Sequence, residues 1–154
     1  MKLSSPAFSH GKKIPICYTC EGENISPPLH IEDVPHEAKS LALIMDDPDV
    51  PSWVREDGVY DHWIIFNMLP STEKIAEGKA PLASFGKNTS GSHDYVGPCP
   101  PDREHRYFFT LFALDITLKL PSGITKKELE KAMEGHILEK AQLIGLYEKR
   151  EKSY

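Results

Sequence analysis

The segment that most constrains the fold is a long apolar run over residues 105–118, with the sequence HRYFFTLFALDITL. Aromatic and β-branched residues dominate this run, and such residues favour strands. Its middle is apolar at nearly every position, rather than at every second one, so we expect a strand that is buried on both faces. A strand of this kind places β structure at the core of the protein.

Proline usage supports the same interpretation. The chain has 13 prolines in 154 residues, well above the usual share of about 5%, and proline breaks helices and fixes turns. Further strands are predicted at residues 40–45 and 62–68, and residues 14–20 are interpreted as an extended segment. Two prolines soon after residue 45 end the first of these strands and open a rigid loop. The predicted fold is therefore mainly β.

One helix is predicted with a clear start and a clear end. Thr125 and Glu128 have the spacing of a capping box, apolar residues follow at helical spacing, and Gly135 ends the helix. Residues 137–141 could form a second short helix, and residues 142–147 a last strand. Because no linker, repeat or low-complexity segment divides the chain, we expect a single domain over residues 1–154.

Charge and hydropathy argue against several classes of partner. The net charge is −5, whereas nucleic-acid-binding surfaces are basic. No apolar run approaches the length of a membrane span, and the N-terminus lacks the apolar region of a secretion signal. We therefore expect no nucleic-acid partner, no integral membrane segment and a cytoplasmic location.

The cysteines support the same location. Three cysteines, an odd and small number, fit a reducing cytosol better than a disulfide-stapled secreted domain. Cys17 and Cys20 form a C-x-x-C pair, but a zinc site would need a second pair and only Cys99 remains. We expect all three to be ordinary core or surface residues, with no metal site and no cofactor.

Chemically capable side chains gather at three boundaries between predicted strands and loops, where sheet ends bring side chains into pockets. At the first boundary, Asp47 and Asp49 are two residues apart on an extended backbone, so both carboxylates point to the same side. Prolines hold this segment, and the bond before Pro51, a structural residue, is a candidate cis peptide. Taken alone, such aspartates are more often turn-formers.

At the second boundary, Tyr60 and His62 are expected to share one face of a strand, while Trp63 takes the other. At the third, His105 and Tyr107 share a face, and Arg106 points away to form a structural ion pair. A histidine at a strand start is more often structural than functional. The three boundaries together predict one polar pocket for a phosphate-like anion, built from Asp47, Asp49, His62, His105 and Tyr107.

These motifs, taken in order, resemble the signature of the phosphatidylethanolamine-binding protein family, which includes the Raf kinase inhibitor protein. The N-terminal segment 18–29 (YTCEGENISPPL) and the ending, residues 135–138 and 145–147, resemble its compact bacterial and archaeal branch. The motifs that carry the resemblance are Asp47-Pro48-Asp49-x-Pro51, His62-Trp63, Gly97-x-x-Pro100-Pro101 and His105-Arg106-Tyr107.

The resemblance implies a large antiparallel sheet packed on a smaller one, with few helices, and a pocket that binds phosphate-type anions or phospholipid head groups. It also implies a possible kinase or protease partner and a homodimer. The spacer Asp102-Arg103-Glu104 departs from the family pattern, because it lacks a glycine often present there and adds two acids near the pocket mouth. The pocket positions are Asp47, Asp49, Tyr60, His62, Pro100, Pro101, His105 and Tyr107.

In such a pocket, the carboxylates and the hydrogen-bond donors would have different roles. One carboxylate would hold a histidine ring N–H and favour the imidazolium form, and another would accept from a ligand's ammonium group. The phosphate would take donors from His62 or His105, from Tyr107 and from backbone N–H groups of the glycine-rich loop.

The alternative is a hydrolase or a metal-dependent enzyme, since paired aspartates and histidines also bind metals or act as acid–base pairs. No motif places a serine or cysteine nucleophile, however, and the order of the groups fits no known hydrolase pattern. We therefore expect a binding protein rather than an enzyme.

Overall fold

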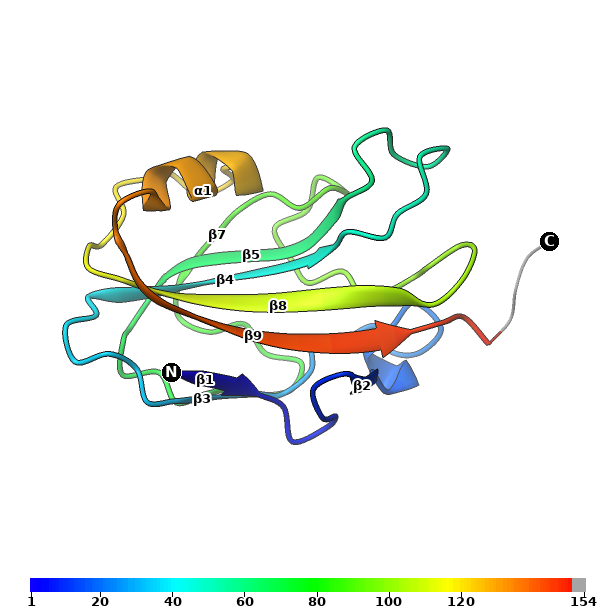
Figure 1. Cartoon of the computed structure of the whole chain (residues 1–154), viewed down its shortest axis with the longest axis horizontal. Coiled ribbons are helices and arrows are strands. Elements are labelled where there is room, and N and C mark those ends of the chain that lie inside the picture. Colours follow the sequence, from blue (N-terminus) through cyan, green and yellow to red (C-terminus); the bar gives the residue numbers. More distant parts are fainter. Residues whose placement is uncertain (151–154) are drawn as a thin grey trace.

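In the computed structural model, residues 1–150 are described, and they form two β-sheets, a short 3-10 helix (Ile16–Tyr18) and one α-helix, α1 (Lys126–Met133) (Figure 1). The small sheet has the order β1 (Lys2–Ser4), β3 (Leu29–Glu32) and β6 (Lys74–Ile75). The large sheet has the order β2 (Lys12–Lys13), β9 (Ile137–Tyr147), β8 (His105–Leu114), β4 (Ser40–Asp47), β5 (Tyr60–Met68) and β7 (Ser84–Phe85). All neighbouring strands are antiparallel except β2 and β9.

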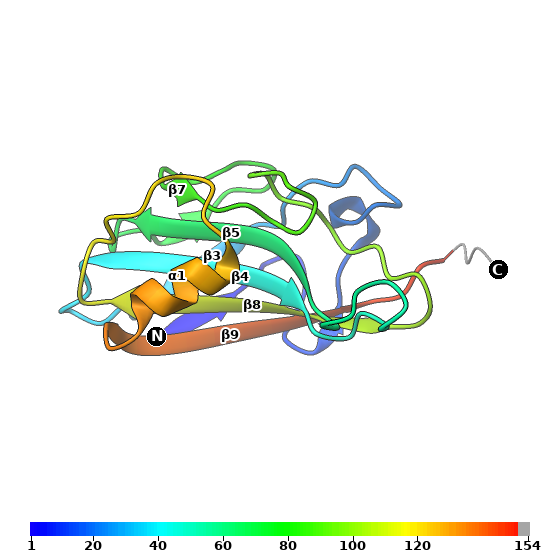
Figure 2. The same ribbon diagram turned by 90° about the horizontal axis from the view of Figure 1, so that it is seen from above.

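The large sheet is covered on both faces, which explains why its central strands are apolar throughout. Along β4, Leu41, Leu43 and Met45 pack toward the small sheet, while Ala42 and Ile44 pack toward α1. Figure 2 shows α1 lying across these central strands. The predicted fold, a large sheet on a smaller one with a helix near the C-terminus, is confirmed. The predicted burial of β8 on both faces is confirmed only from Leu111 onward, because Arg106 is exposed and Phe108 and Thr110 are half-buried.

The capping box of α1 is confirmed, because the Thr125 side chain accepts the N–H of Glu128 and the Glu128 side chain accepts the N–H of Thr125. The second predicted helix, over residues 137–141, is wrong. These residues belong to β9, which pairs with β8 over almost its whole length, so that ladder hydrogen bonds override a weak local helix signal. Gly135, with a positive φ of 78°, reverses the chain between α1 and this strand.

Three further expectations need correction. The strand predicted to stop at residue 45 continues to Asp47, immediately before Pro48, and the strand over residues 105–118 ends at Leu114. The described residues contain no cis peptide bond, so the bond before Pro51 is trans. Within this same described range, no helix is long and apolar enough to cross a membrane.

Candidate functional site

A cavity of about 240 Å³ lies where β4, β5 and β8 meet two loops, and it gathers the predicted pocket residues. Apolar side chains form much of its wall, including Val50, Val54 and Val96, which sequence reasoning did not identify. Larger hollows elsewhere on the surface, such as that between residues 30–34 and 70–74, do not contain these residues. Of the predicted residues, those that line the cavity are Asp47, Tyr60, His62, Pro100, Pro101, His105 and Tyr107.

A β-bulge directs His62 into this cavity. Trp63 and Asp61 pair with consecutive residues of β4, so His62 is an extra residue in β5. Such a bulge re-aims side chains, and bulges are common beside binding sites. Trp63 packs in the core between the two sheets, and His62 turns to the same side, where its ring lies 5.3 Å from that of Tyr107. Tyr60 and His62 do share a face, with ring centroids 4.7 Å apart, but the prediction that Trp63 takes the opposite face is wrong.

His105 lies between two carboxylates on the floor of the cavity. Its Nδ1 is 2.6 Å from Oδ2 of Asp47, and its Nε2 is 2.7 Å from Oδ1 of Asp102. Burial lowers the pKa of His105, but the hydrogen bonds and charges of the two aspartates outweigh burial, so the pKa lies above its ordinary value. With a carboxylate acceptor at each ring nitrogen, the imidazolium form is the one that satisfies both contacts.

His62 has the opposite protonation preference. Burial lowers its pKa, and this effect exceeds the opposing one of its hydrogen bond to a carbonyl. Its Nδ1 lies 2.6 Å from the carbonyl oxygen of Val96, which can only accept, so Nδ1 carries the proton. The neutral ring therefore has Nε2 as an acceptor. The expectation that His62 donates to a phosphate does not agree with this arrangement.

Tyr107 contributes a hydroxyl that is available to a ligand. The residue is fully buried, and burial followed by the nearby charge of Asp47 raises the pKa of its phenol. The hydroxyl faces that carboxylate without the geometry of a hydrogen bond, so among the described residues it has no hydrogen-bond partner. A buried hydroxyl without a partner is costly, and a ligand oxygen in the cavity would remove this cost.

Asp49 lies outside the cavity, unlike Asp47. Its carboxylate receives two hydrogen bonds from the Arg106 guanidinium, at 2.9 and 2.8 Å, and a third from the backbone N–H of Arg106. The predicted structural ion pair of Arg106 is therefore confirmed. The two aspartates diverge because Asp47 is still in β4 and turns inward, while its Oδ1 accepts the N–H of Asp49 in a tight turn.

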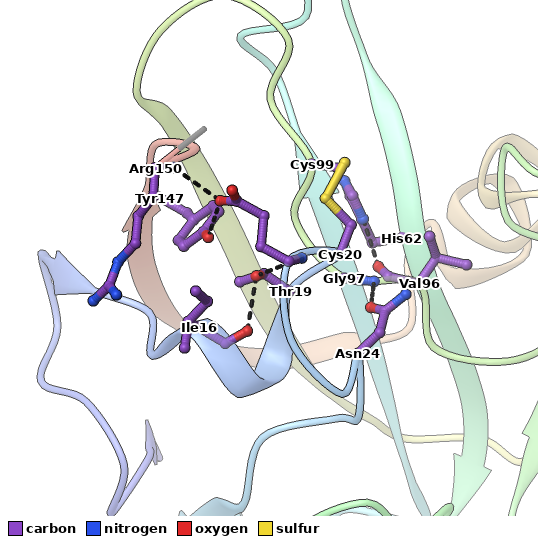
Figure 3. The surroundings of a disulfide bond; sticks show 11 residues. Ile16, Thr19, Cys20, Asn24, His62, Val96, Gly97, Cys99, Tyr147 and Arg150 are labelled. Atoms are coloured by element: carbon purple, nitrogen blue, oxygen red, sulfur yellow. Dashed lines mark hydrogen bonds between the residues drawn. A yellow bond between two sulfur atoms is a disulfide. The ribbon is translucent and has the colours of Figure 1, made fainter. Parts of the chain in front are cut away.

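A disulfide between Cys20 and Cys99 fastens the loop that forms one wall of the cavity (Figure 3). The expectation that all three cysteines are ordinary unpaired residues is wrong, and among the described residues only Cys17 is free. The segment around Cys20 is a 3-10 helix and turn rather than an extended stretch. This compact turn brings Cys20 to the loop, where its N–H also donates to the carbonyl of Pro98.

The same loop has few backbone donors left for a ligand. The N–H of Gly97 donates to Oδ1 of Asn24 at 2.8 Å (Figure 3). Positions 98, 100 and 101 are prolines and have no N–H. Within residues 97–101, at most the N–H of Cys99 remains, so the predicted role of loop N–H groups in holding a phosphate is largely unsupported. Gly97 itself is required, because a Cβ there would lie 2.3 Å from the carbonyl oxygen of Tyr18.

Asp102 was noted in the sequence only as an acid near the pocket mouth. Its contact with His105 was not predicted, although the i, i+3 spacing of the two residues was a usable signal. Partial burial acts to raise the pKa of Asp102, but the hydrogen bond and charge of His105 outweigh it and leave the pKa below its ordinary value.

Comparison with known proteins identifies relatives along nearly the whole chain. The sequence profile of the phosphatidylethanolamine-binding protein family matches residues 4–148. A UPF0098 protein of Chlamydia pneumoniae is 54% identical over 149 residues, covering 97% of this chain and 99% of that protein. A UPF0098 protein of the archaeon Methanothermobacter thermautotrophicus is 52% identical over 153 residues, covering 96% of this chain and 98% of that protein.

Two solved structures are also similar. A phosphatidylethanolamine-binding protein homologue from Chlamydia trachomatis has a TM-score of 0.94 and 53% identity, covering 96% of this chain and 97% of its own. YbcL of Escherichia coli, described as a new member of the mammalian PEBP family, has a TM-score of 0.87 and 25% identity, covering 97% of this chain and 98% of its own.

Proposed function

The chain belongs to the phosphatidylethanolamine-binding protein family, and on that premise we propose that its cavity binds a small phosphate-type anion, such as a phospholipid head group, without catalysing a reaction. The observation that carries this proposal is His105, a cation held on the cavity floor by two carboxylates. Both ring N–H groups already donate to these carboxylates, so the imidazolium would attract a phosphate through its positive charge. The Tyr107 hydroxyl supplies a hydrogen-bond donor beside it.

The cavity also has groups suited to the cationic end of a zwitterionic ligand. Tyr60 offers an aromatic ring at the side of His62, and aromatic faces attract ammonium groups. The neutral His62 ring offers Nε2 as an acceptor. With a volume of about 240 Å³, the site is smaller than typical cavities for drug-sized ligands. It suits a compact head group such as phosphoethanolamine.

The lining favours binding over hydrolysis. The sulfur of Cys99 is held in the disulfide, and the hydroxyls that reach the cavity, those of Tyr60 and Tyr107, are phenols. The proposal therefore assigns no nucleophile to the cavity.

A protein partner, kinase or protease, stays a prediction. An exposed apolar patch on α1 would support a partner or homodimer face there, but its apolar residues Leu129 and Met133 are buried. The large apolar side chains that are exposed among the described residues are Trp53, Val54, Leu69, Leu82, Ile137 and Leu138, none of them on α1.

Calorimetric titration with phosphoethanolamine tests the proposed function. We expect saturable binding by the wild-type protein at about pH 6, and an affinity at least roughly tenfold weaker for His105→Gln, because the cavity loses its positive charge. His136→Gln is the matched control, since His136 also pairs with an aspartate, Asp115, but on the surface and outside the cavity. Equal binding by all three proteins would show that His105 does not hold the ligand, and no binding by wild type would refute the proposed function.

A further inference from the structure

A second cavity, of about 350 Å³, lies beside the first. Its lining comes from residues 24–26, 78–80, 93–95 and 122, together with Trp63 of β5 and Phe85 of β7. The two cavities share a wall, because Tyr95 lines the second while Val96 and Gly97 line the first. Asn24 of the second cavity fixes this wall by accepting the N–H of Gly97 (Figure 3). None of the residues assigned to the anion site lines the second cavity, so the two cavities are chemically distinct.

Aromatic rings form the inner part of the second cavity. Trp63 is buried, and its ring meets that of Tyr95 edge to face, with centroids 5.4 Å apart. The Tyr95 hydroxyl donates to the carbonyl of Tyr18 at 2.8 Å, so Tyr95 offers only its ring. Phe85 adds a third, half-buried ring. Because aromatic rings favour edge-to-face or offset contacts with another ring, these walls suit a ligand that carries one.

Two hydrogen-bond donors of the second cavity lack a partner in the protein. Ser26, like Trp63, is buried. Neither the Ser26 hydroxyl nor the Trp63 indole N–H donates to any atom of residues 1–150, yet solvent still reaches both groups. Since both residues line the second cavity, they meet solvent there. A buried donor without a protein partner is costly, so an acceptor atom on the ring of a ligand would be stabilised at this depth.

The rim of the second cavity carries one cation and one anion, Lys79 and Asp94. Both side chains are exposed, and neither forms an ion pair with any residue between 1 and 150. Two unpaired charges of opposite sign at one rim complement a zwitterionic head group, whose carboxylate would face Lys79 and whose ammonium would face Asp94.

We propose that the second cavity binds a free aromatic amino acid, with its ring against Trp63 and Tyr95 and its zwitterionic head group at the rim. Tyrosine is the amino acid that fits best, because its phenol oxygen can accept from the Ser26 hydroxyl and the Trp63 indole N–H. A volume of about 350 Å³ is at the lower end of the range of ligand pockets, about 300–1,000 Å³, and suits a molecule of this size. The second cavity would hold this ligand whether or not the first one binds an anion.

Trp63 provides a direct readout of binding, because the chain has only two tryptophans. In an NMR titration with L-tyrosine, we expect the indole N–H signal of Trp63 to shift saturably, with a Kd of at most about 1 mM. The signal of Trp53, which is exposed and lies outside the second cavity, should stay in place. Trp53→Phe assigns the two signals. The absence of a saturable shift at Trp63 would overturn the proposal.

Variants and ligand analogues test each contact in matched pairs. Lys79→Gln should weaken L-tyrosine about threefold and leave tyramine, which lacks the carboxylate, unaffected. Asp94→Asn should weaken both of these ligands by a similar factor and leave 4-hydroxyphenylpropionate, which lacks the ammonium, unaffected. Wild type should bind L-tyrosine about fivefold more tightly than L-phenylalanine, and Ser26→Ala should reduce this preference. Lys87→Gln, which removes an exposed lysine outside the second cavity, is the control and should change none of these affinities.

Three further results would overturn the proposal. Equal wild-type affinities for L-tyrosine, L-phenylalanine and tyramine would show that the cavity recognises neither the phenol oxygen nor the head group. An equal loss in Lys79→Gln and Lys87→Gln would reduce the effect to net charge. Loss of L-tyrosine binding in His105→Gln would place the ligand in the first cavity. We expect His105→Gln to bind L-tyrosine, and Ser26→Ala to bind phosphoethanolamine, as wild type does, so each proposal can fail without the other.

Discussion

Replacing Cys20 and Cys99 together by serine is expected to lower the free energy of unfolding by about 4 kcal/mol. The disulfide joins residues separated by 79 positions, and closing a loop of that length removes much entropy from the unfolded chain, by about 4 kcal/mol at room temperature. Since typical domains are stable by only about 5–15 kcal/mol, this is a large share. Equilibrium unfolding in urea, at matched protein concentration, measures it.

Cys17→Ser is the matched control for this prediction. Cys17 is three residues from Cys20, is partly buried and forms no disulfide, so its replacement removes a thiol without opening the loop. A double variant as stable as Cys17→Ser would show that the Cys20–Cys99 bond contributes nothing to folding. Because Cys99 also lines the cavity, the double variant is expected to bind phosphoethanolamine more weakly even where it is fully folded.

The second large effect is expected for Asp47→Ala, which should lower the free energy of unfolding by about 3 kcal/mol. The variant leaves the buried Nδ1 of His105 and the N–H of Asp49 without their acceptor, and buried groups that lose a partner are costly. Asp49→Ala, two residues away, breaks the pair with Arg106, whose side chain is 54% exposed. That loss should be about 1 kcal/mol, because solvent screens the pair.

The difference between the stability losses of Asp47→Ala and Asp49→Ala should depend on pH in a definite direction. The pKa of His105 is raised in the folded protein, so its ion pair with Asp47 stabilises the fold fully below the unfolded histidine pKa. This contribution is lost as the pH rises through the higher pKa that His105 has in the folded protein. Urea unfolding of wild type, Asp47→Ala and Asp49→Ala at several pH values should therefore show the excess cost of Asp47→Ala shrinking at alkaline pH. Equal costs for the two variants at acidic pH would contradict the buried pair.

Much of this site could be predicted from sequence because it lies at strand ends with regular alternation. In β8 the period of two places His105 and Tyr107 on one face and Arg106 on the other, and the structure agrees. His62 was correctly predicted to face the pocket, but Trp63 was wrongly predicted to face the other side. The β-bulge at His62 interrupts the regular alternation of side chains, and nothing in the local sequence indicates it.

Two of the remaining errors arise from contacts between distant segments, and a third arises from a local turn. The Cys20–Cys99 pairing depends on how a turn near the N-terminus meets a loop 79 residues later, and neither composition nor spacing encodes that meeting. The strand at residues 137–141 is determined by its pairing with β8 rather than by its own residues. Asp49 was placed in the cavity because an ideal extended backbone was assumed, whereas the chain turns after Asp47.

The most direct test of the central claim, that the His105 imidazolium holds an anion, is the pH dependence of affinity. Ethanolamine O-sulfate is the ligand of choice, because its sulfate group keeps a single negative charge over the whole range, whereas a phosphate ester gains its second charge near pH 6. Since the pKa of His105 is raised, calorimetric affinity should hold through neutral pH and fall as pH rises past that pKa, when the ring loses its charge. An affinity that is flat from about pH 6 to 9 would contradict the account.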